Sequence, residues 1–211
     1  MVDFSLGQKM ILWVIPLIFA VTIHETAHGF VAFQCGDPTA KLLGRLTLNP
    51  IKHIDPIGTI VVPAILFFLG GFVFGWAKPV PITWRNLKNP RRDMALVAAA
   101  GPLANLVMAF FWVAVAKLAI DFHSVPFIYM GQIGVSVNLV LMLLNCIPIP
   151  PLDGSRIVAS LLSPKMACQF NQLEIYGFLI LVLLLASGLL TRLLGPLLQG
   201  LTSIFFRIFN L

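Results

Sequence analysis

The chain alternates long apolar runs with short polar connections, and five of the runs are long enough to form helices that cross a membrane. A spanning helix needs about 20 apolar residues, because the hydrocarbon layer of a bilayer is roughly 30 Å thick. The five runs are Met10–Phe33, Ile57–Trp76, Met94–Ile120, Pro126–Ile147 and Ile175–Leu194. A sixth run, Pro196–Leu211, is shorter and begins at the Gly195-Pro196 break, which predicts an interfacial or frayed helix rather than a crossing. The pattern predicts an all-α polytopic membrane protein with about four to five transmembrane helices.

The second run, residues 57–76, is a poor candidate for a straight spanning helix. It contains Pro63 near its centre and a Gly70-Gly71 pair further on, and both features weaken a helix. A full crossing would also place three cations before the run and five cations after it on opposite sides of the membrane, against the positive-inside bias. A segment that dips into the membrane and returns, for example as a re-entrant β-hairpin, fits both observations. A kinked crossing remains the alternative.

The composition agrees with a surface that is covered by lipid. Hydrophobic residues make up 59% of the chain and charged residues only 10%, whereas soluble domains carry about 25% charge. This excludes a soluble cytosolic enzyme. The net charge of +6 does not indicate a nucleic-acid partner, because eight of the fourteen Lys and Arg lie in residues 41–92, between apolar runs, as in cytoplasmic loops. We expect one membrane-embedded domain over residues 1–211.

The first apolar run carries the sequence His24-Glu25-Thr26-Ala27-His28, which matches the pattern H-E-x-x-H. One helical turn separates the two histidines, so both imidazoles project from one face, as two ligands of a zinc ion require. Glu25 is offset around the helix, where it would contact a water molecule rather than the metal. A carboxylate within hydrocarbon is costly and needs a partner or a wet cavity. Hydrogen bonding to neighbouring helices without any chemistry is the competing interpretation.

A catalytic zinc site needs a third protein ligand, and the sequence offers three candidates. His53 lies in a polar connection, where we expect a surface or capping role, and His123 lies in a short link on the opposite side. Asp153 follows a run with three prolines between residues 148 and 151, which forbid a regular helix there. Irregular backbone at membrane depth implies a cavity, so Asp153 is the better candidate. Capping of a helix over Ser155–Leu162 is its other expected role.

The two histidines and Asp153 can meet only if the helices run in suitable directions. His28 lies near the end of the first run, and Asp153 lies just after the fourth run. Both must then reach the same side of the membrane, which requires the first and fourth runs to be parallel and the third to be antiparallel to them. This arrangement works only if the second run returns to the side from which it started. The metal hypothesis and the charge distribution therefore favour the same topology.

Three motifs in this order resemble the site-2 protease family of intramembrane zinc metalloproteases: HETAH at residues 24–28, GPLAN at 101–105 and N-x-x-P-x-x-P-L-D-G at 145–154. The resemblance extends over most of the chain, including residues 49–58 and 75–81. It implies that one Zn²⁺ per chain is held by His24, His28 and Asp153, and that Glu25 is the catalytic acid/base. It also implies that Asn145 helps to hold the substrate backbone. We expect a small bacterial-type member of the family, without a PDZ or CBS domain.

The resemblance implies hydrolysis of a peptide bond in or near a transmembrane helix of a substrate protein, as in regulated intramembrane proteolysis. We expect Asn105 to face the same cavity, with packing of Gly101 and Ala104 against a neighbouring helix as the alternative. We expect a multi-pass protein of the cell membrane whose active site opens toward the cytoplasmic, basic side. Its expected partners are this substrate and the lipid bilayer, and its oligomeric state remains open. A membrane di-iron oxygenase is excluded because the chain has only four histidines, whereas a metal transporter and an inactive scaffold remain alternatives.

Overall fold

The computed structural model describes residues 4–62, 65 and 75–209, and these residues form helices and connections without a strand. The elements are α1 (Leu6–Gln34), α2 (Thr39–Leu42), η1 (Pro50–His53), η2 (Pro56–Val61), η3 (Trp84–Asn86), α4 (Pro90–Asp121), α5 (Val125–Asn145), α6 (Asp153–Leu161), α7 (Pro164–Gln172), α8 (Glu174–Ala186) and α9 (Leu189–Phe209). In the described residues, four helices are long and apolar enough to cross a membrane: α1, α4, α5 and α9. Helices α7 and α8 form a pair bent by 54° that would make a fifth crossing. The prediction of an all-α polytopic membrane protein is confirmed.

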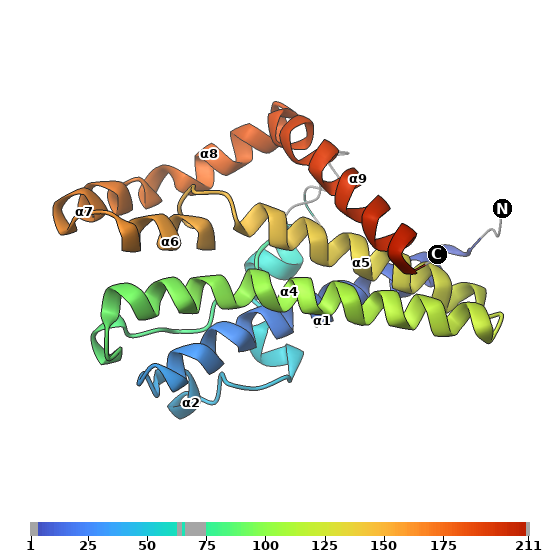
Figure 1. Cartoon of the computed structure of the whole chain (residues 1–211), viewed down its shortest axis with the longest axis horizontal. Coiled ribbons are helices and arrows are strands. Elements are labelled where there is room, and N and C mark those ends of the chain that lie inside the picture. The colour runs from blue at the N-terminus through green and yellow to red at the C-terminus, as the bar shows by residue number, and fades with distance from the viewer. Residues whose placement is uncertain (1–3, 63–64, 66–74, 210–211) are drawn as a thin grey trace.

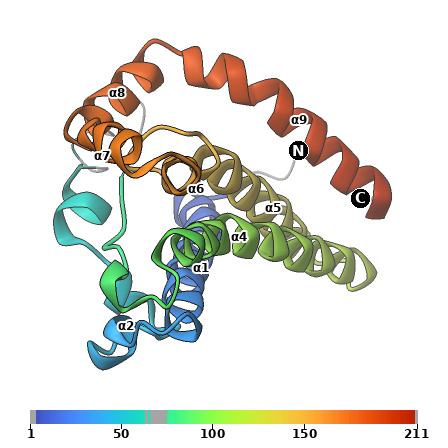
Figure 2. The ribbon, with the colours of Figure 1, turned by 60° about the vertical axis from the view of Figure 1, so that its left-hand side comes forward.

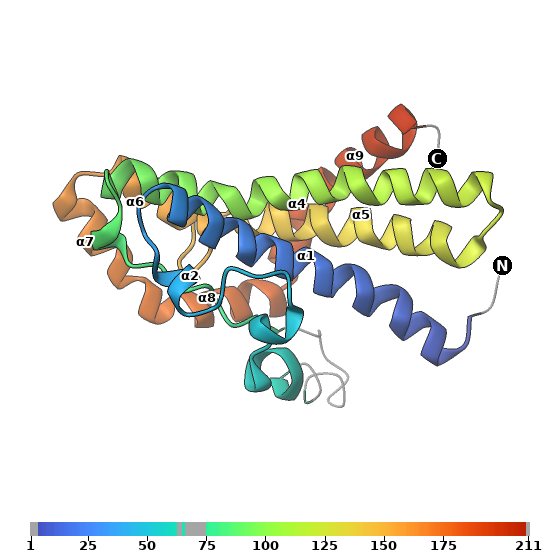
Figure 3. The ribbon, with the colours of Figure 1, turned by 90° about the horizontal axis from the view of Figure 1, so that it is seen from below.

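The directions of the long helices agree with the predicted topology. Helices α1 and α5 run toward the same end of the bundle, and α4 runs in the opposite direction (Figures 1 and 3). Because α1 ends where α4 begins, the chain between them returns to the end of the bundle that it left. The predicted dip falls largely on residues 63–64 and 66–74, which lie outside the described residues, so its form remains a prediction. Before that gap, Pro56–Val61 form a π-helix.

Helices α4 and α5 pack closely because a glycine on α5 leaves room for a large side chain of α4. A Cβ added to Gly134 of α5 would lie only 2.3 Å from the ring of Trp112 on α4, which no side chain could occupy. Around this contact lies the apolar core, which includes Leu12 of α1, Leu139 of α5 and Phe205 of α9. Figure 2 shows α8 and α9 passing over the α5 side of the bundle. The core thus fixes α1, which carries the histidine pair, relative to α4 and α5.

The prediction for the C-terminal part of the chain is wrong in two respects. The run Ile175–Leu194 is not one span, because α8 ends at Ala186 and Gly188 adopts a left-handed φ of 68°, which costs glycine little. The helix also does not break at Gly195-Pro196, since α9 continues through both residues to Phe209. A proline inside an apolar helix is tolerated where neighbouring groups satisfy the freed carbonyl. Helix α9 is therefore long enough to cross the membrane, whereas a surface position was predicted.

Candidate metal centre

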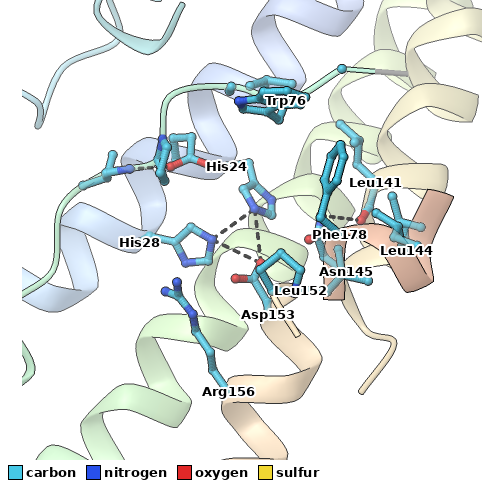
Figure 4. A pocket seen from close by; sticks show the side chains of 18 of the residues that line it. His24, His28, Trp76, Leu141, Leu144, Asn145, Leu152, Asp153, Arg156 and Phe178 are labelled. Carbon is cyan, nitrogen blue, oxygen red and sulfur yellow. Dashed lines mark hydrogen bonds and ion pairs between the residues drawn. The ribbon is translucent and has the colours of Figure 1, made fainter. Parts of the chain in front are cut away.

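Three buried side chains from two distant parts of the chain meet at one point. His24 and His28 project from the same face of α1, and their Nε2 atoms lie 3.0 Å apart. Asp153, the first residue of α6, places its Oδ2 atom 3.2 Å from each of these nitrogens (Figure 4). Among the described residues, this is the group of His, Cys and acidic side chains whose spacing could hold a metal ion. The structure thus brings together the histidine pair and the aspartate that the sequence singled out.

A chain of amide hydrogen bonds fixes the orientation of the His24 ring. The Nδ2 atom of Asn105 donates to the backbone oxygen of Ala20 at 3.2 Å and to Oδ1 of Asn138 at 3.0 Å. The Oδ1 atom of Asn105 is therefore the atom that faces Nδ1 of His24, at 2.6 Å. Because an amide oxygen only accepts, Nδ1 of His24 must donate a proton. The Nε2 atom of the neutral ring then presents a lone pair to the metal centre.

The His28 ring is oriented by a backbone carbonyl in the same manner. Its Nδ1 atom lies 2.6 Å from the oxygen of Val97 on α4, and a carbonyl oxygen accepts only. With Nδ1 as the donor, the neutral form of this ring also has an Nε2 lone pair that points into the centre. Gly101 allows this approach, because a Cβ at that position would lie 2.4 Å from Nε2 of His28 and 2.5 Å from Cε1 of His24. Any larger residue at position 101 would push the imidazoles away.

The donor set fits a zinc ion. Two imidazole lone pairs face each other, and the buried Oδ2 atom of Asp153 has no hydrogen-bond donor. Three electron-pair donors at such distances repel one another unless a proton or a metal cation lies among them. Imidazole nitrogen and carboxylate oxygen are common zinc ligands, and three protein ligands leave one position open, as in catalytic sites. The hydrogen bonds from each Nδ1 supply the outer support that zinc-binding histidines usually have.

The position of Asp153 follows from the irregular segment before it. Helix α5 ends at Asn145, and the prolines of residues 146–152 deny the chain the backbone donors of a regular helix. Helix α6 then begins at Asp153 with Leu152 as its N-cap residue, and no side chain donates or accepts at this cap. The expectation that Asp153 caps this helix is therefore wrong. Its carboxylate is free of that role and points at the histidines.

Asn105 contacts the His24 ring on the side away from the ligand group and is fully buried. The prediction that Asn105 faces a cavity beside the ligands is therefore wrong. We expect the substitution Asn105→Leu to weaken zinc binding by about 10–100-fold, the usual effect of losing an outer-shell partner. Competition with a zinc chelator, on protein whose folding has been checked by thermal unfolding, measures this change. Ser136→Ala is the matched control, because the Ser136 hydroxyl on α5 only donates to its own helix, at Gln132. An unchanged zinc affinity in Asn105→Leu would contradict the assigned role.

Glu25 lies beside the metal centre and is held by a backbone amide. Its Oε2 atom accepts a hydrogen bond of 2.7 Å from the Val80 N–H, and Glu25 is not among the residues whose spacing could hold a metal ion. Val80 belongs to the extended segment 77–83, which runs alongside α1 and is tied down at both ends. Arg45 donates to the Lys78 carbonyl at 2.8 Å, and Thr83 donates its N–H to Asp37 at 2.6 Å. The segment 77–83 therefore positions the Glu25 carboxylate.

Asp37 is the buried anchor of segment 77–83. Burial alone would raise the pKa of the Asp37 carboxyl, but hydrogen bonds from Thr39, Asn86 and the Thr83 N–H outweigh it and hold the pKa below its ordinary value. The side chain is fully enclosed, so each of these bonds is shielded from water. Because the pKa in the folded state is lower than in the unfolded chain, the carboxylate stabilises the fold above about pH 4, and this stabilisation is lost as the pH falls through the folded-state pKa.

We expect Asp37→Asn to lower the free energy of unfolding by about 1–3 kcal/mol at pH 7, because an amide nitrogen would face a backbone donor. The difference from the wild type should shrink as the pH is lowered from neutrality, and thermal unfolding in detergent at several pH values measures it. Asp55→Asn is the control, since Asp55 also accepts two backbone N–H groups but is only half-buried, and its effect should be smaller. A difference that does not depend on pH would contradict the prediction.

A cavity of about 650 Å³, called here the metal-site cavity, opens beside the ligand group. Its polar wall includes His24, Glu25, His28, Asn145, Asp153, Arg156 and Glu174, and its apolar wall comes from α1, α5, α8 and the segment near Trp76. The Trp76 and Phe178 rings meet edge to face, with centroids 5.5 Å apart. The cavity therefore combines metal ligands, a separate carboxylate, an amide and a cation, enclosed by helices that reach into the membrane.

The two other candidate histidines lie away from this centre. His53 is buried, with 2% of its surface exposed, and its Nε2 atom lies 2.9 Å from the Thr47 carbonyl oxygen. The expected surface or capping role is wrong, because the chain folds back over η1 and its backbone oxygen accepts from Lys78 N–H at 2.9 Å. His123 is exposed in the link between α4 and α5, at the opposite end of the bundle. Neither His53 nor His123 is therefore placed to serve as the third metal ligand.

The fold and the site together define a multi-pass membrane protein with a buried His-His-Asp metal centre and a glutamate next to it. A family profile described as peptidase family M50 matches residues 12–124, and the sequence H-E-x-x-H lies within that match. The chain belongs to peptidase family M50 and is a zinc metalloprotease of the site-2 protease type.

Relatives of known name agree with this membership. The protein named "Putative zinc metalloprotease YwhC" from Bacillus subtilis (strain 168) is 42% identical over 194 residues, which cover 89% of this chain and 85% of YwhC. Rip2 of Mycolicibacterium smegmatis, which carries the same zinc metalloprotease description, is 32% identical over 83% of this chain and 66% of its own length. Zinc metalloprotease MJ0392 of Methanocaldococcus jannaschii is 24% identical over 78% of this chain. No solved structure was found to match the chain.

Proposed function

We propose that this zinc metalloprotease acts within the membrane and hydrolyses a peptide bond in or beside a transmembrane helix of its substrate. One zinc ion per chain is held by His24, His28 and Asp153, with Glu25 as general acid/base. The observation that carries the proposal is the buried convergence of Asp153 with the two histidines of α1, a helix long and apolar enough to span the bilayer.

The depth of the ligands in α1 supports action within the membrane. The 29 residues of α1 are about 43 Å long at 1.5 Å per residue. By the same rise, His24 lies about 15 Å from the last residue of the helix, Gln34. Because the hydrocarbon layer is about 30 Å thick, the ligands lie below the lipid headgroups. Only a segment that enters the membrane could bring a peptide bond to this point.

The residues around the centre supply the remaining requirements of hydrolysis. Zinc, when bound, would lower the pKa of a water molecule and polarise a carbonyl group. Glu25 accepts the proton of the attacking water and delivers it to the departing amine nitrogen. The Val80 N–H holds one oxygen of Glu25 and so keeps the carboxylate beside the ligands. Asn145, on the cavity wall, offers an amide that can bond the backbone of an unwound substrate.

The distribution of charge supports an active site that faces the cytoplasm from the cell membrane. The connection from α1 to the start of α4 holds eight Lys and Arg, whereas residues 122–124 between α4 and α5 hold none. Cytoplasmic connections carry the excess of positive charge. Asp153 of the metal centre is the first residue of α6, and α6 lies toward the end of the bundle at which α1 ends and α4 begins (Figure 1). This end carries the basic connection.

We expect removal of zinc to abolish cleavage reversibly. The purified protein, reconstituted in liposomes with a peptide that contains a transmembrane helix, is treated with a zinc chelator and then supplied with metal. Cleavage should stop and return with Zn²⁺ but not with Mg²⁺, because Mg²⁺ prefers six oxygen ligands in octahedral geometry. Metal analysis of the active protein should give one zinc per chain. Cleavage that continues in metal-free protein would overturn the proposed function.

A further inference from the structure

A second cavity, of about 960 Å³, adjoins the metal-site cavity at the basic end of the bundle. It lies among the first turn of α4, helix α6 and helix α7. Met94 and Ile175 contribute apolar surface, and Arg91, Ser160 and Asn171 contribute polar groups. Ligand-binding pockets usually have volumes of about 300–1,000 Å³, so this second cavity is large enough to hold a stretch of polypeptide.

The two cavities share part of their wall. Pro151, Arg156 and Glu174 line both of them. Arg156 lies three residues after Asp153 on α6, and residues at this spacing share one face of a helix. Figure 4 shows its side chain extending from α6 toward His28 and the Asp153 carboxylate. The boundary between the cavities therefore lies directly beside the metal centre, with a cation on α6 and an anion at the start of α8.

Arg156 and Glu174 carry opposite charges, but they do not pair with each other. In the described part of the chain, neither Arg156 nor Glu174 forms an ion pair or a side-chain hydrogen bond. A guanidinium group offers only donors, and a carboxylate offers only acceptors. An extended peptide backbone presents carbonyl oxygens and N–H groups in alternation, so it can bind to both. A lipid phosphate would be attracted by Arg156 but repelled by Glu174.

We propose that the second cavity binds the part of the substrate polypeptide that continues from the scissile bond out of the membrane. This flank lies extended and passes between Arg156 and Glu174, which bind its carbonyl oxygens and N–H groups. The inference rests on the proposed function and adds to it the class of substrate. Such a substrate has an unstructured flank on the active-site side, because a folded flank could not pass the boundary.

Photo-crosslinking in the Glu25→Gln variant tests where the flank lies. The probe is a synthetic peptide with an apolar helix of about 20 residues and a flank of about 12 residues, about 40 Å when extended. A photoreactive phenylalanine at Ser160, inside the second cavity, should crosslink to the flank. The same group at Leu161, which is 81% exposed on the same helix, should not. Crosslinks from position 160 to lipid alone, or to a second copy of the chain, would overturn the proposal.

Cleavage kinetics separate this inference from the proposed function. The substitution Ala159→Trp fills the second cavity, and we expect it to lower kcat/KM at least 10-fold for the peptide with the long flank. A peptide whose flank is removed should be cleaved as by the wild type, and the control Leu161→Trp should leave both peptides unaffected. If the wild type cleaves neither peptide, the proposed function fails. If Ala159→Trp lowers both rates equally while its zinc content is intact, or leaves both unchanged, only the inference about the second cavity fails.

Discussion

Replacement of Glu25 by glutamine is expected to reduce peptide-bond cleavage by about 10²–10⁴-fold, the usual contribution of general acid–base catalysis. The glutamine amide cannot take a proton from water at neutral pH or return it to the leaving amine. It has the size of glutamate, and its oxygen can still accept the 2.7 Å hydrogen bond from the Val80 N–H. Glu25 is not in the ligand group, so zinc binding should remain. The loss should appear in kcat and not in metal content.

Three measurements on the same preparation check this result: zinc per chain, thermal unfolding, and cleavage of a transmembrane peptide in liposomes. Asp121→Asn is the control, because it removes an exposed carboxylate at the far end of α4 and should change none of them. Full activity in Glu25→Gln would show that another group transfers the proton. A loss of zinc together with activity would place Glu25 among the ligands, against the geometry of the site.

The sequence predicts the long helices well where breaker residues bound an apolar run. Helices α1, α4 and α5 lie close to the predicted runs, because Gly36, Pro38 and Pro90 mark where the polar connection begins and ends. The bounds of the C-terminal helices were predicted wrongly, since the apolar residues continue on both sides of Ser187-Gly188 and do not show that the chain bends there. The break at Gly188 depends on how α8 and α9 pack, and that information is not local.

In the candidate site, too, the positions that are set within one helix could be predicted, whereas the contacts between distant parts of the chain could not. His24, Glu25 and His28 could be recognised because one helical turn determines their relative positions. The rotation of α4 could not be predicted, and it places Asn105 behind His24 instead of on the cavity wall. Asn138 was missed although a polar amide in an apolar helix is a signal for an interhelical bond. The part played by Val80 leaves no trace in the sequence, because its backbone N–H makes the contact.

The second large effect is expected from Asp153→Asn, which should remove zinc from the protein. An amide oxygen lacks the negative charge that complements the cation, so zinc affinity should fall by more than the about 10–100-fold that is typical for an outer-shell partner. The substitution keeps the shape of the side chain. Because the contacts of Oδ2 of Asp153 are with the two histidines of the ligand group, and it has no other hydrogen-bond donor, no bond outside the ligand group is lost. Activity should therefore disappear with the metal while the helices remain folded.

The metal-free proteins provide an independent readout of the same site. In Asp153→Asn, the new amide N–H₂ can donate to the Nε2 lone pairs of His24 and His28, which Oδ2 now faces at 3.2 Å. We therefore expect the metal-free variant to unfold at a temperature at least as high as the metal-free wild type, and zinc to stabilise only the wild type. His123→Asn, in the exposed link, is the control and should retain zinc-dependent stabilisation. Equal stabilisation of Asp153→Asn and the wild type by zinc would contradict the assignment of Asp153 as a ligand.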